Sequence, residues 1–565
     1  MFGFARNSKE PLSDPRAAQR WVASLATSDP LAFRDTVVHE LAHVAQSATR
    51  RRPYELEALF VVDAHARTVL DALVAQYLEH GTRSARIEAQ LWDALFQLNE
   101  SFRTAYGACE RDALAQAHDT RWTPLLAELV ARQTMHLAFD AKLRMFRYEP
   151  WIPAKWAELH SRFALACAHG FERERLHLTG DSRAVTVEQL YIVALVLQLA
   201  NAGNLSRPQI DWLATHLEKW CASLRMSVTS PASTAFYVDV AQGTGLRRRG
   251  DQPLEGEVLF LDTDPLHGLL QHYILAIEQK IRSQPISSKT PLRVERLALL
   301  TKVAAQIDAQ FRPLKRRGER TAAVGTVDVV VGLSAICGYL HEEARAPVPE
   351  LDTVSTFSDT IDLAVFGHLR HDRDKRKELA RRRLAAFAPP GGPWEMKDVS
   401  ATGVRLVATM EAACVLTLGM LAVMRTQRDL VWRLGVVRRM RRMTPERAEI
   451  GLQCIADSVS VIDVLAQPQA AGSAEETSVT GSPRERRFRA LFLVLHAAQH
   501  GAAVQSLILP AAEYRARRRL FVSTPTQDHP IRCGTLLERG PEWAWVSLEP
   551  LPIGRPRESA LAPAG

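Results

Sequence analysis

The spacing of apolar residues changes part-way along this 565-residue chain, and the change constrains the fold more than any other feature. Before about residue 225, Ala, Leu, Glu, Gln and Arg dominate and Gly is sparse. Apolar side chains recur there at helical spacing in three segments, 54–77, 87–102 and 125–139. Ser206 followed by Pro208 predicts the N-cap and first turn of one more helix. Residues 1–225 are therefore expected to form an all-α helical array.

Strand-like sequence begins near Met226, where Ser, Thr, Gly and β-branched residues become more frequent. Segments 235–240 and 258–261 predict strands, and the stretch 266–311 that follows them is helical in pattern. We therefore treat 226–311 as a connecting segment that holds both strands and helices. The next apolar segment, 324–333, first alternates and then becomes continuously apolar, as a strand that enters a core would.

Short strand candidates dominate the sequence after residue 393. Five of them follow one another at 394–398, 403–409, 420–425, 432–440 and 449–455. This spacing is typical of an antiparallel barrel or sandwich, and we expect a barrel over 312–458 with 338–393 inserted in a surface loop. In the C-terminal segment 459–552 we expect a helix at 488–505 and a β segment at 503–548, and in 553–565 a disordered tail. The predicted fold class is thus α+β and multidomain.

Composition narrows the classes of protein to consider. Apolar residues make up 47% of the chain, which excludes disorder as its main state. Lys and Arg number 71 against 63 Asp and Glu, and this mild excess does not by itself indicate nucleic acid. The seven cysteines are scattered, which favours a reducing compartment. Neither a signal peptide nor an apolar run of about 20 residues is evident, so we expect a cytoplasmic protein with no membrane span.

Two short motifs carry the strongest chemical signal. Arg316 and Arg320 form an RxxxR pattern just before the 324–333 strand, with Arg317 between them. Planar guanidinium groups suit phosphate oxygens and the O6/N7 edge of guanine. Asp398, Ser400 and Gly403 form a DxSxxG pattern between two predicted strands. There the Asp and Ser side chains suit the edges of a base or a ribose, and Gly allows a sharp turn or the close approach of a ligand.

With both motifs in this order, each beside a predicted strand, the region 312–458 resembles a PilZ domain, the bacterial receptor module for cyclic di-GMP. The later strands with Gly435 and Gly451 support the resemblance. It implies a β-barrel that binds cyclic di-GMP and has no catalytic chemistry or cofactor of its own. The 77 residues between Arg320 and Asp398 depart from the family, in which this connection is short.

The resemblance also implies roles for individual residues. Arg316 and Arg320, with Arg317 beside them, would hold phosphates and guanine edges. Asp398 and Ser400 would contact a guanine or hold the arginine-bearing arm in place, and Gly403 would serve the turn. Binding would change the pose of neighbouring domains, and an unidentified protein partner is expected on the helical N-terminal domain. A degenerate barrel that serves as a structural adaptor is the alternative within this family.

A competing motif suggests an enzyme. His39-Glu40-Leu41-Ala42-His43 matches HExxH, in which two His one helical turn apart bind zinc and Glu activates water. A zinc metallopeptidase is therefore a second hypothesis. Helical phase argues against it, because Val37, Leu41 and Val44 share a face nearly opposite to that of His39 and His43. The two imidazoles would then point to solvent, and no motif supplies a third ligand.

Overall fold

The computed structural model describes residues 11–551 except for 17 gaps. The gaps are residues 26, 48–49, 82–83, 117–118, 179–183, 201–202, 230–234, 251–253, 255, 284–289, 311–319, 346–392, 414, 427–430, 467–485, 496–503 and 524–527. Its contacts divide the chain into two compact units. The first comprises 1–315 with 441–443, and the second comprises 316–440 with 444–565. Among the described helices, none combines the length and apolar character that crossing a bilayer requires.

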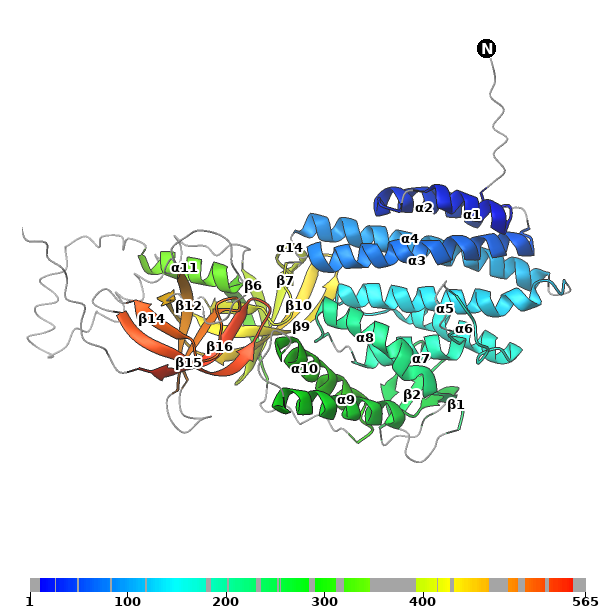
Figure 1. Cartoon of the computed structure of the whole chain (residues 1–565). Coiled ribbons are helices and arrows are strands. Elements are labelled where there is room, and N and C mark those ends of the chain that lie inside the picture. Colours follow the sequence, from blue (N-terminus) through cyan, green and yellow to red (C-terminus); the bar gives the residue numbers. More distant parts are fainter. Residues whose placement is uncertain are drawn as a thin grey trace, which may run out of the picture. The chain divides into compact units, whose positions relative to one another are not determined.

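The first unit is built from helices and one small sheet (Figure 1). Its α-helices are α1 (Pro15–Ser24), α2 (Pro30–Gln46), α3 (Pro53–His80), α4 (Ala85–Ala115), α5 (Thr123–Phe146), α6 (Pro153–His169), α7 (Val187–Ala200), α8 (Arg207–Trp220), α9 (Asp264–Ser283) and α10 (Thr290–Ile307), with a short 3₁₀ turn, η1 (Cys221–Ser223). The sheet has the antiparallel order β1-β4-β2-β3, with β1 (Met226–Ser227), β2 (Phe236–Asp239), β3 (Arg247–Arg248) and β4 (Val258–Leu261).

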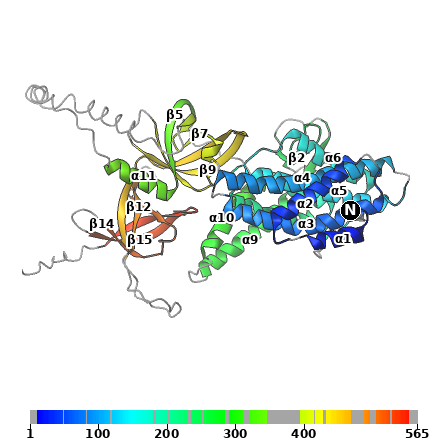
Figure 2. The same ribbon diagram turned by 90° about the horizontal axis from the view of Figure 1, so that it is seen from above.

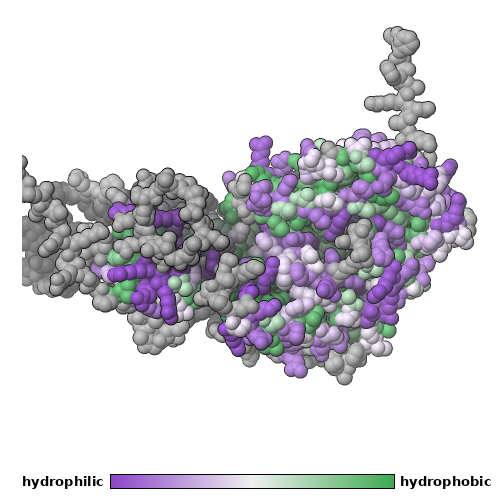
Figure 3. Space-filling view, in the orientation of Figure 1, coloured by the Kyte–Doolittle hydropathy of each residue, from purple (hydrophilic) through white to green (hydrophobic). Residues whose placement is uncertain are grey.

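Proline sets where many of these helices begin. Eight helices (α1, α2, α3, α5, α6, α8, α9 and α10) carry Pro in their first turn, where the missing N–H costs nothing and φ is already helical. The helix predicted after Ser206 is confirmed as α8, and Gln209 Oε1 accepts a 3.0 Å hydrogen bond from the Ser206 backbone N–H. The long helices α3, α4 and α5 pack side by side around one continuous apolar core (Figure 2). Polar and apolar side chains are interspersed on the face of this unit drawn in Figure 3.

The second unit holds two six-stranded closed barrels. The first barrel contains β5 (Thr321–Val331), β6 (Trp394–Ser400), β7 (Gly403–Thr409), β8 (Leu421–Thr426), β9 (Arg433–Thr444) and β10 (Arg447–Ala456), with helices α11 (Leu333–Arg345) and α14 (Met410–Ala413) in its connections. The second contains β11 (Ser460–Ala466), β12 (Arg486–Leu495), β13 (Val504–Pro510), β14 (Arg519–Ser523), β15 (Asp528–Arg539) and β16 (Trp543–Pro550). The predicted fold class, an α-helical region followed by antiparallel barrel structure, is confirmed.

The two barrels share one topology. The first closes in the order β10-β7-β6-β5-β8-β9, and the second in the order β11-β12-β13-β16-β15-β14. When the strands of each barrel are numbered one to six along the chain, both circles read 6-3-2-1-4-5. The C-terminal β segment is therefore a second copy of the barrel architecture that precedes it.

One prediction for the C-terminal segment is wrong. Residues 488–495 belong to strand β12, whereas we expected a helix over 488–505; residues 496–503 lie outside the described part of the chain. Ala490 packs in the core of the second barrel, while Leu491 and Leu493 pack in a cluster shared by both barrels and α11. Because both faces of β12 are covered, its sequence is almost continuously apolar and lacks the alternation that marks a strand.

The expected insertion begins as regular structure. Helix α11 starts directly after β5, and its C-terminal half falls within 338–393. Ile336 and Cys337 of α11 lie in the cluster shared by the two barrels. Residues 346–392, which include the basic run 370–383, are outside the described part of the chain. The long connection between β5 and β6 thus contributes a helix to the junction of the two barrels.

Candidate functional site

The described members of the two predicted motifs meet at one end of the first barrel. Arg320 directly precedes β5, Asp398 and Ser400 are in β6, and Gly403 begins β7. The strand registers pair Thr321 with Val399 and Ser400 with Gly403, so the ends of three neighbouring strands coincide. Arg316 and Arg317 were also predicted to belong to the site, and they fall in 311–319, outside the described residues.

The carboxylate of Asp398 links two arginines. Arg320 Nη1 donates to Asp398 Oδ1 at 2.9 Å, and Arg405 Nη2 lies 2.5 Å from Asp398 Oδ2. Asp398 is only 7% exposed, whereas the two arginine side chains are about two-fifths exposed. A buried carboxylate thus holds two guanidinium groups in place while part of each arginine side chain stays exposed. Such a pair can receive phosphate oxygens without first having to be ordered.

Sequence reasoning missed Arg405 and its second partner, Glu449. Arg405 Nη1 lies 3.3 Å from Glu449 Oε2 of β10, so the charged network crosses from β6 through β7 to β10. A signal for Arg405 was available in the sequence. A two-residue turn between Ser400 and Gly403 places Arg405 directly opposite Asp398 on the hairpin, as the register confirms. Glu449 had no such local signal, because β10 joins β7 only through the closure of the barrel.

Ser400 and Gly403 shape the turn beside this network. Ser400 Oγ donates to the Gly403 carbonyl oxygen at 3.1 Å, so its hydroxyl is engaged within the turn. A Cβ atom on Gly403 would lie 2.7 Å from the Leu452 carbonyl oxygen of β10. Gly403 is therefore needed for the close approach of the neighbouring backbone. The predicted contacts of these two residues with a ligand stay predictions.

The competing metal motif lies on helix α2. Phe33, Val37 and Leu41 are the buried residues of that helix, as the helical phase predicted. His39 and His43 are exposed, with their Nε2 atoms 3.2 Å apart. Across the described residues, no group of three or more His, Cys, Asp and Glu side chains is arranged to hold a metal ion. The two imidazoles thus lack a third protein ligand in that part of the chain.

Comparison with known proteins points to one family of receptors. Residues 16–232 match the family model for the N-terminal domain of the cyclic-di-GMP receptor FimW. Cyclic-di-GMP receptor FimW of Pseudomonas aeruginosa is 28% identical over 210 residues, which is 36% of this chain and 33% of that protein. The match thus spans about a third of the length of that curated relative.

The matched residues include α1 to α8 and end in the small sheet of the first unit. They do not reach β5, where the first barrel begins. The similarity therefore concerns the helical part of the chain and does not include the motifs of the first barrel.

Proposed function

We propose that this chain is a receptor for cyclic di-GMP and that the ligand binds at the end of the first barrel, which we interpret as a PilZ domain. The single observation that carries the location is the Asp398 carboxylate with Arg320 and Arg405 on its two oxygens. The similarity of residues 16–232 to a protein named as a cyclic-di-GMP receptor supports the ligand from a different part of the chain.

In this proposal different residues bind different parts of the ligand. Arg320, together with Arg316 and Arg317 that precede it, binds the phosphates and the O6/N7 edge of a guanine. Asp398 contacts a guanine N–H or keeps Arg320 in place, and Ser400 and Gly403 maintain the turn. No catalytic step and no cofactor are part of the proposal. We also propose a cytoplasmic location.

The proposed response is a change in the relative positions of the two units. Residues 312–320 follow the last helix of the first unit and precede the first strand of the second. A ligand that binds the arginines of this connection stabilises the arrangement of the two units for which it has the higher affinity. The shift in the equilibrium cannot exceed the difference between its binding free energies for the two arrangements. The helical unit would then present a changed surface to a protein partner.

The sequence favours the first barrel over the second as the site of nucleotide binding. The eight residues before β11, 452–459, contain no Arg. Residues 493–503, which form the end of β12 and its connection to β13, contain neither Asp nor Ser. The second barrel thus repeats the strand order without the residues that suit a guanine nucleotide.

Isothermal titration of the full chain with cyclic di-GMP tests the proposal, with GTP and cyclic GMP as ligand controls. We expect saturable binding in the micromolar range or tighter, selective over both controls. Arg320→Ala should weaken it about 10- to 100-fold, the value of a hydrogen bond to a charged group. Arg447→Ala is the matched control. It removes a cation from the opposite end of the same barrel, where Arg447 pairs with Glu395 and faces Thr409.

The outcomes separate a receptor from an adaptor. Binding that Arg320→Ala weakens and Arg447→Ala leaves intact supports the proposal. An absence of binding, with an unchanged thermal midpoint on addition of the nucleotide, would make the first barrel a scaffold. Equal losses in both variants would mean that only the general positive charge of the barrel attracts the ligand.

A further inference from the structure

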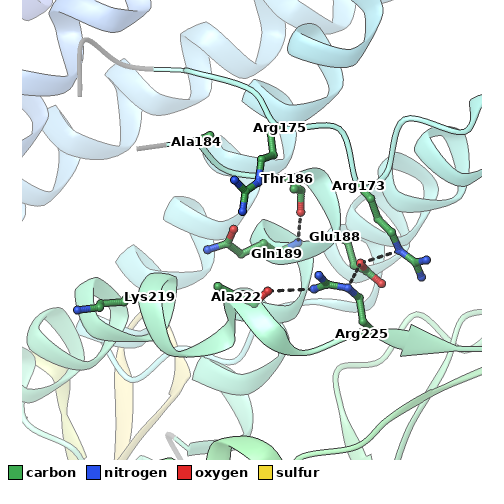
Figure 4. A pocket seen from close by; sticks show the side chains of 9 residues that line it. All are labelled: Arg173, Arg175, Ala184, Thr186, Glu188, Gln189, Lys219, Ala222 and Arg225. Carbon is green, nitrogen blue, oxygen red and sulfur yellow. Dashed lines mark hydrogen bonds and ion pairs between the residues drawn. The ribbon is translucent and has the colours of Figure 1, made fainter. Parts of the chain in front are cut away.

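A cavity of about 290 Å³ lies in the first unit, and none of its lining residues belongs to a barrel strand. Three elements meet around it, namely the connection before α7, the first turn of α7, and the end of α8 with the residues that follow (Figure 4). Four cationic side chains line it, Arg173, Arg175, Lys219 and Arg225, against one carboxylate, Glu188. This excess of positive charge in a concave site suggests an anionic ligand.

Both oxygens of the Glu188 carboxylate already have partners within the protein. Glu188 is 1% exposed, and its Oε1 accepts a 2.9 Å hydrogen bond from the Met226 backbone N–H. Its Oε2 accepts from Arg173 Nε at 3.1 Å and lies 3.6 Å from Arg225 Nε. Glu188 therefore offsets only part of the charge of these two arginines while it holds them at the wall of the cavity, and Glu172 Oε1 lies 3.9 Å from Arg173 Nε. The single negative charge of Glu188 leaves nothing to offset the other two cations.

Among the residues that the structure describes, Arg175 and Lys219 have no counter-ion. Both side chains are exposed, and neither makes a hydrogen bond or an ion pair with a described residue. In Figure 4 the Arg175 guanidinium points toward Gln189 across the cavity. The first turn of α7 adds the partial positive charge of a helix N-terminus to the same place.

The wall that carries these groups is held by hydrogen bonds. Leu176 and Val185 exchange backbone hydrogen bonds of 2.9 Å each. These bonds fix the backbone next to Arg175 and next to Thr186. Gln189 is 8% exposed, and its Nε2 donates to the Glu218 carbonyl oxygen, so this amide ties α7 to α8. The backbone that carries Arg175 and Lys219 is thus fixed before any ligand arrives, so that only their side chains have to be ordered on binding.

We propose that this cavity binds a phosphate-bearing anion, with Arg175 and Lys219 as its direct contacts and Arg173 and Arg225 as flanking charges. Sites for whole small molecules usually have volumes of about 300 to 1,000 Å³. The cavity is at the lower limit of that range, so it suits a phosphate or diphosphate group better than an entire cyclic dinucleotide. The site is separate from the one proposed in the first barrel and does not depend on it.

Titration of the full chain with inorganic pyrophosphate tests this inference, with inorganic phosphate and GMP in parallel. We expect saturable binding of pyrophosphate that weakens about tenfold for each cation removed in Arg175→Gln and Lys219→Gln. Arg86→Gln is the matched control, because Arg86 is an exposed cation on α4 that does not line the cavity. Arg320→Ala tests whether the first barrel contributes to pyrophosphate binding, and we expect this variant to bind pyrophosphate as the unaltered chain does.

The controls make the result decisive. Because Arg175 and Lys219 are exposed, the double variant should keep the thermal midpoint of the unaltered chain. Pyrophosphate binding that persists in the double variant, or that Arg86→Gln weakens equally, overturns the inference, as does the absence of any saturable binding. Once saturable binding at the cavity is measured, tighter binding of GMP than of phosphate identifies a nucleotide phosphate as the ligand, whereas equal binding identifies free phosphate.

Discussion

A buried aspartate contacts two basic side chains at two places in this chain, but the surroundings give the two aspartates different uses. Asp63 of α3 contacts Arg132 at 2.8 Å and His136 at 3.1 Å, and all three are almost completely buried. Asp398 contacts Arg320 and Arg405, which are about two-fifths exposed. The Asp63 cluster has no open side for a ligand, so its contribution is to stability. The Asp398 cluster keeps an open side, which is why we place the ligand there.

Replacement of Asp63 by Asn should lower the free energy of unfolding of the first unit by about 3 kcal/mol, since it leaves the buried Arg132 guanidinium with Glu128 as its one remaining carboxylate partner among the described residues. Burial opposes the ionisation of Asp63, but His136, Arg132 and the Tyr106 hydroxyl stabilise the carboxylate more and lower its pKa. Asp71→Asn is the matched control on the same helix, where the 3.7 Å contact of Asp71 with Arg67 is largely exposed. It should cost less than about 1 kcal/mol.

The lowered pKa of Asp63 also predicts how this difference depends on pH. A carboxyl with a folded-state pKa below its unfolded value contributes stability that is complete above the unfolded value, about 3.9, and is lost as pH falls. Urea unfolding of the unaltered chain and of Asp63→Asn should therefore differ most at about pH 7 and less at about pH 3. A difference that does not change over this range would show that the carboxylate charge is not what stabilises the unit.

At the scale of elements, the hairpin of β6 and β7 depends on Gly403 at its turn, where a neighbouring backbone approaches closely. Its two-residue turn pairs Ser400 with Gly403 and so sets Asp398 opposite Arg405. The hairpin also packs against β10, whose Cys454 N–H donates to the Thr402 carbonyl oxygen at 3.0 Å. A change at the turn therefore affects both the barrel closure and the charged network.

Gly403→Ala should destabilise this closure by about 1 to 3 kcal/mol, because the new Cβ would meet the Leu452 carbonyl oxygen at 2.7 Å and the backbone must shift. Hydrogen exchange followed by mass spectrometry should be faster in peptides from β7 and β10. Gly325→Ala in β5 is the control, since a Cβ there meets no atom within 4 Å. Similar exchange in the two variants would mean that the barrel adapts to the extra methyl group.

At the scale of the whole molecule, the second unit is two barrels that share apolar side chains. Trp543 of β16 is fully buried in the shared cluster, and its Nε1 donates to the Gly419 carbonyl oxygen of the first barrel at 2.8 Å. Glu542 accepts a 2.7 Å hydrogen bond from the Leu333 backbone N–H at the start of α11. The duplicated barrels are therefore coupled through side chains of the second that reach into the first.

Trp543→Phe should weaken this coupling, because it leaves the Gly419 carbonyl oxygen without its donor, at a cost of about 1 to 3 kcal/mol. We expect faster hydrogen exchange in β8 of the first barrel, although the substitution is in the second. Trp545→Phe is the matched control, since the Trp545 Nε1 donates within the second barrel, to Ser506 Oγ at 2.9 Å. If both variants accelerate exchange only in the second barrel, the two barrels are not coupled through Trp543.

The presence of two barrels also makes a prediction about binding. If only the first barrel keeps the nucleotide-binding residues, Arg316→Ala with Arg320→Ala should remove all measurable binding of cyclic di-GMP from the full chain. Titration checks this at the highest soluble protein concentration. Residual selective binding in the double variant would show that a second site for the same ligand exists elsewhere in the chain.

The local parts of this architecture could be predicted because local residues determine them. Proline and capping residues mark the starts of helices such as α8, and turn residues bound strands such as β7. The same local order brings Arg405 opposite Asp398 once the hairpin is recognised. The strand β12 could not be predicted in this way, because two cores cover its two faces and erase the period of two.

Residue order and spacing alone determined that this chain has a helical region followed by β structure, and which arginine and aspartate residues could serve an anionic nucleotide. Only the tertiary structure decided that the β structure closes into two barrels of the same strand order, and that Glu449 joins Arg405 and Asp398. It also brought four cations to the wall of one cavity in the first unit. The physical reason is the same in each case. These contacts join segments far apart in the chain, so they exist only after strands have paired and helices have packed.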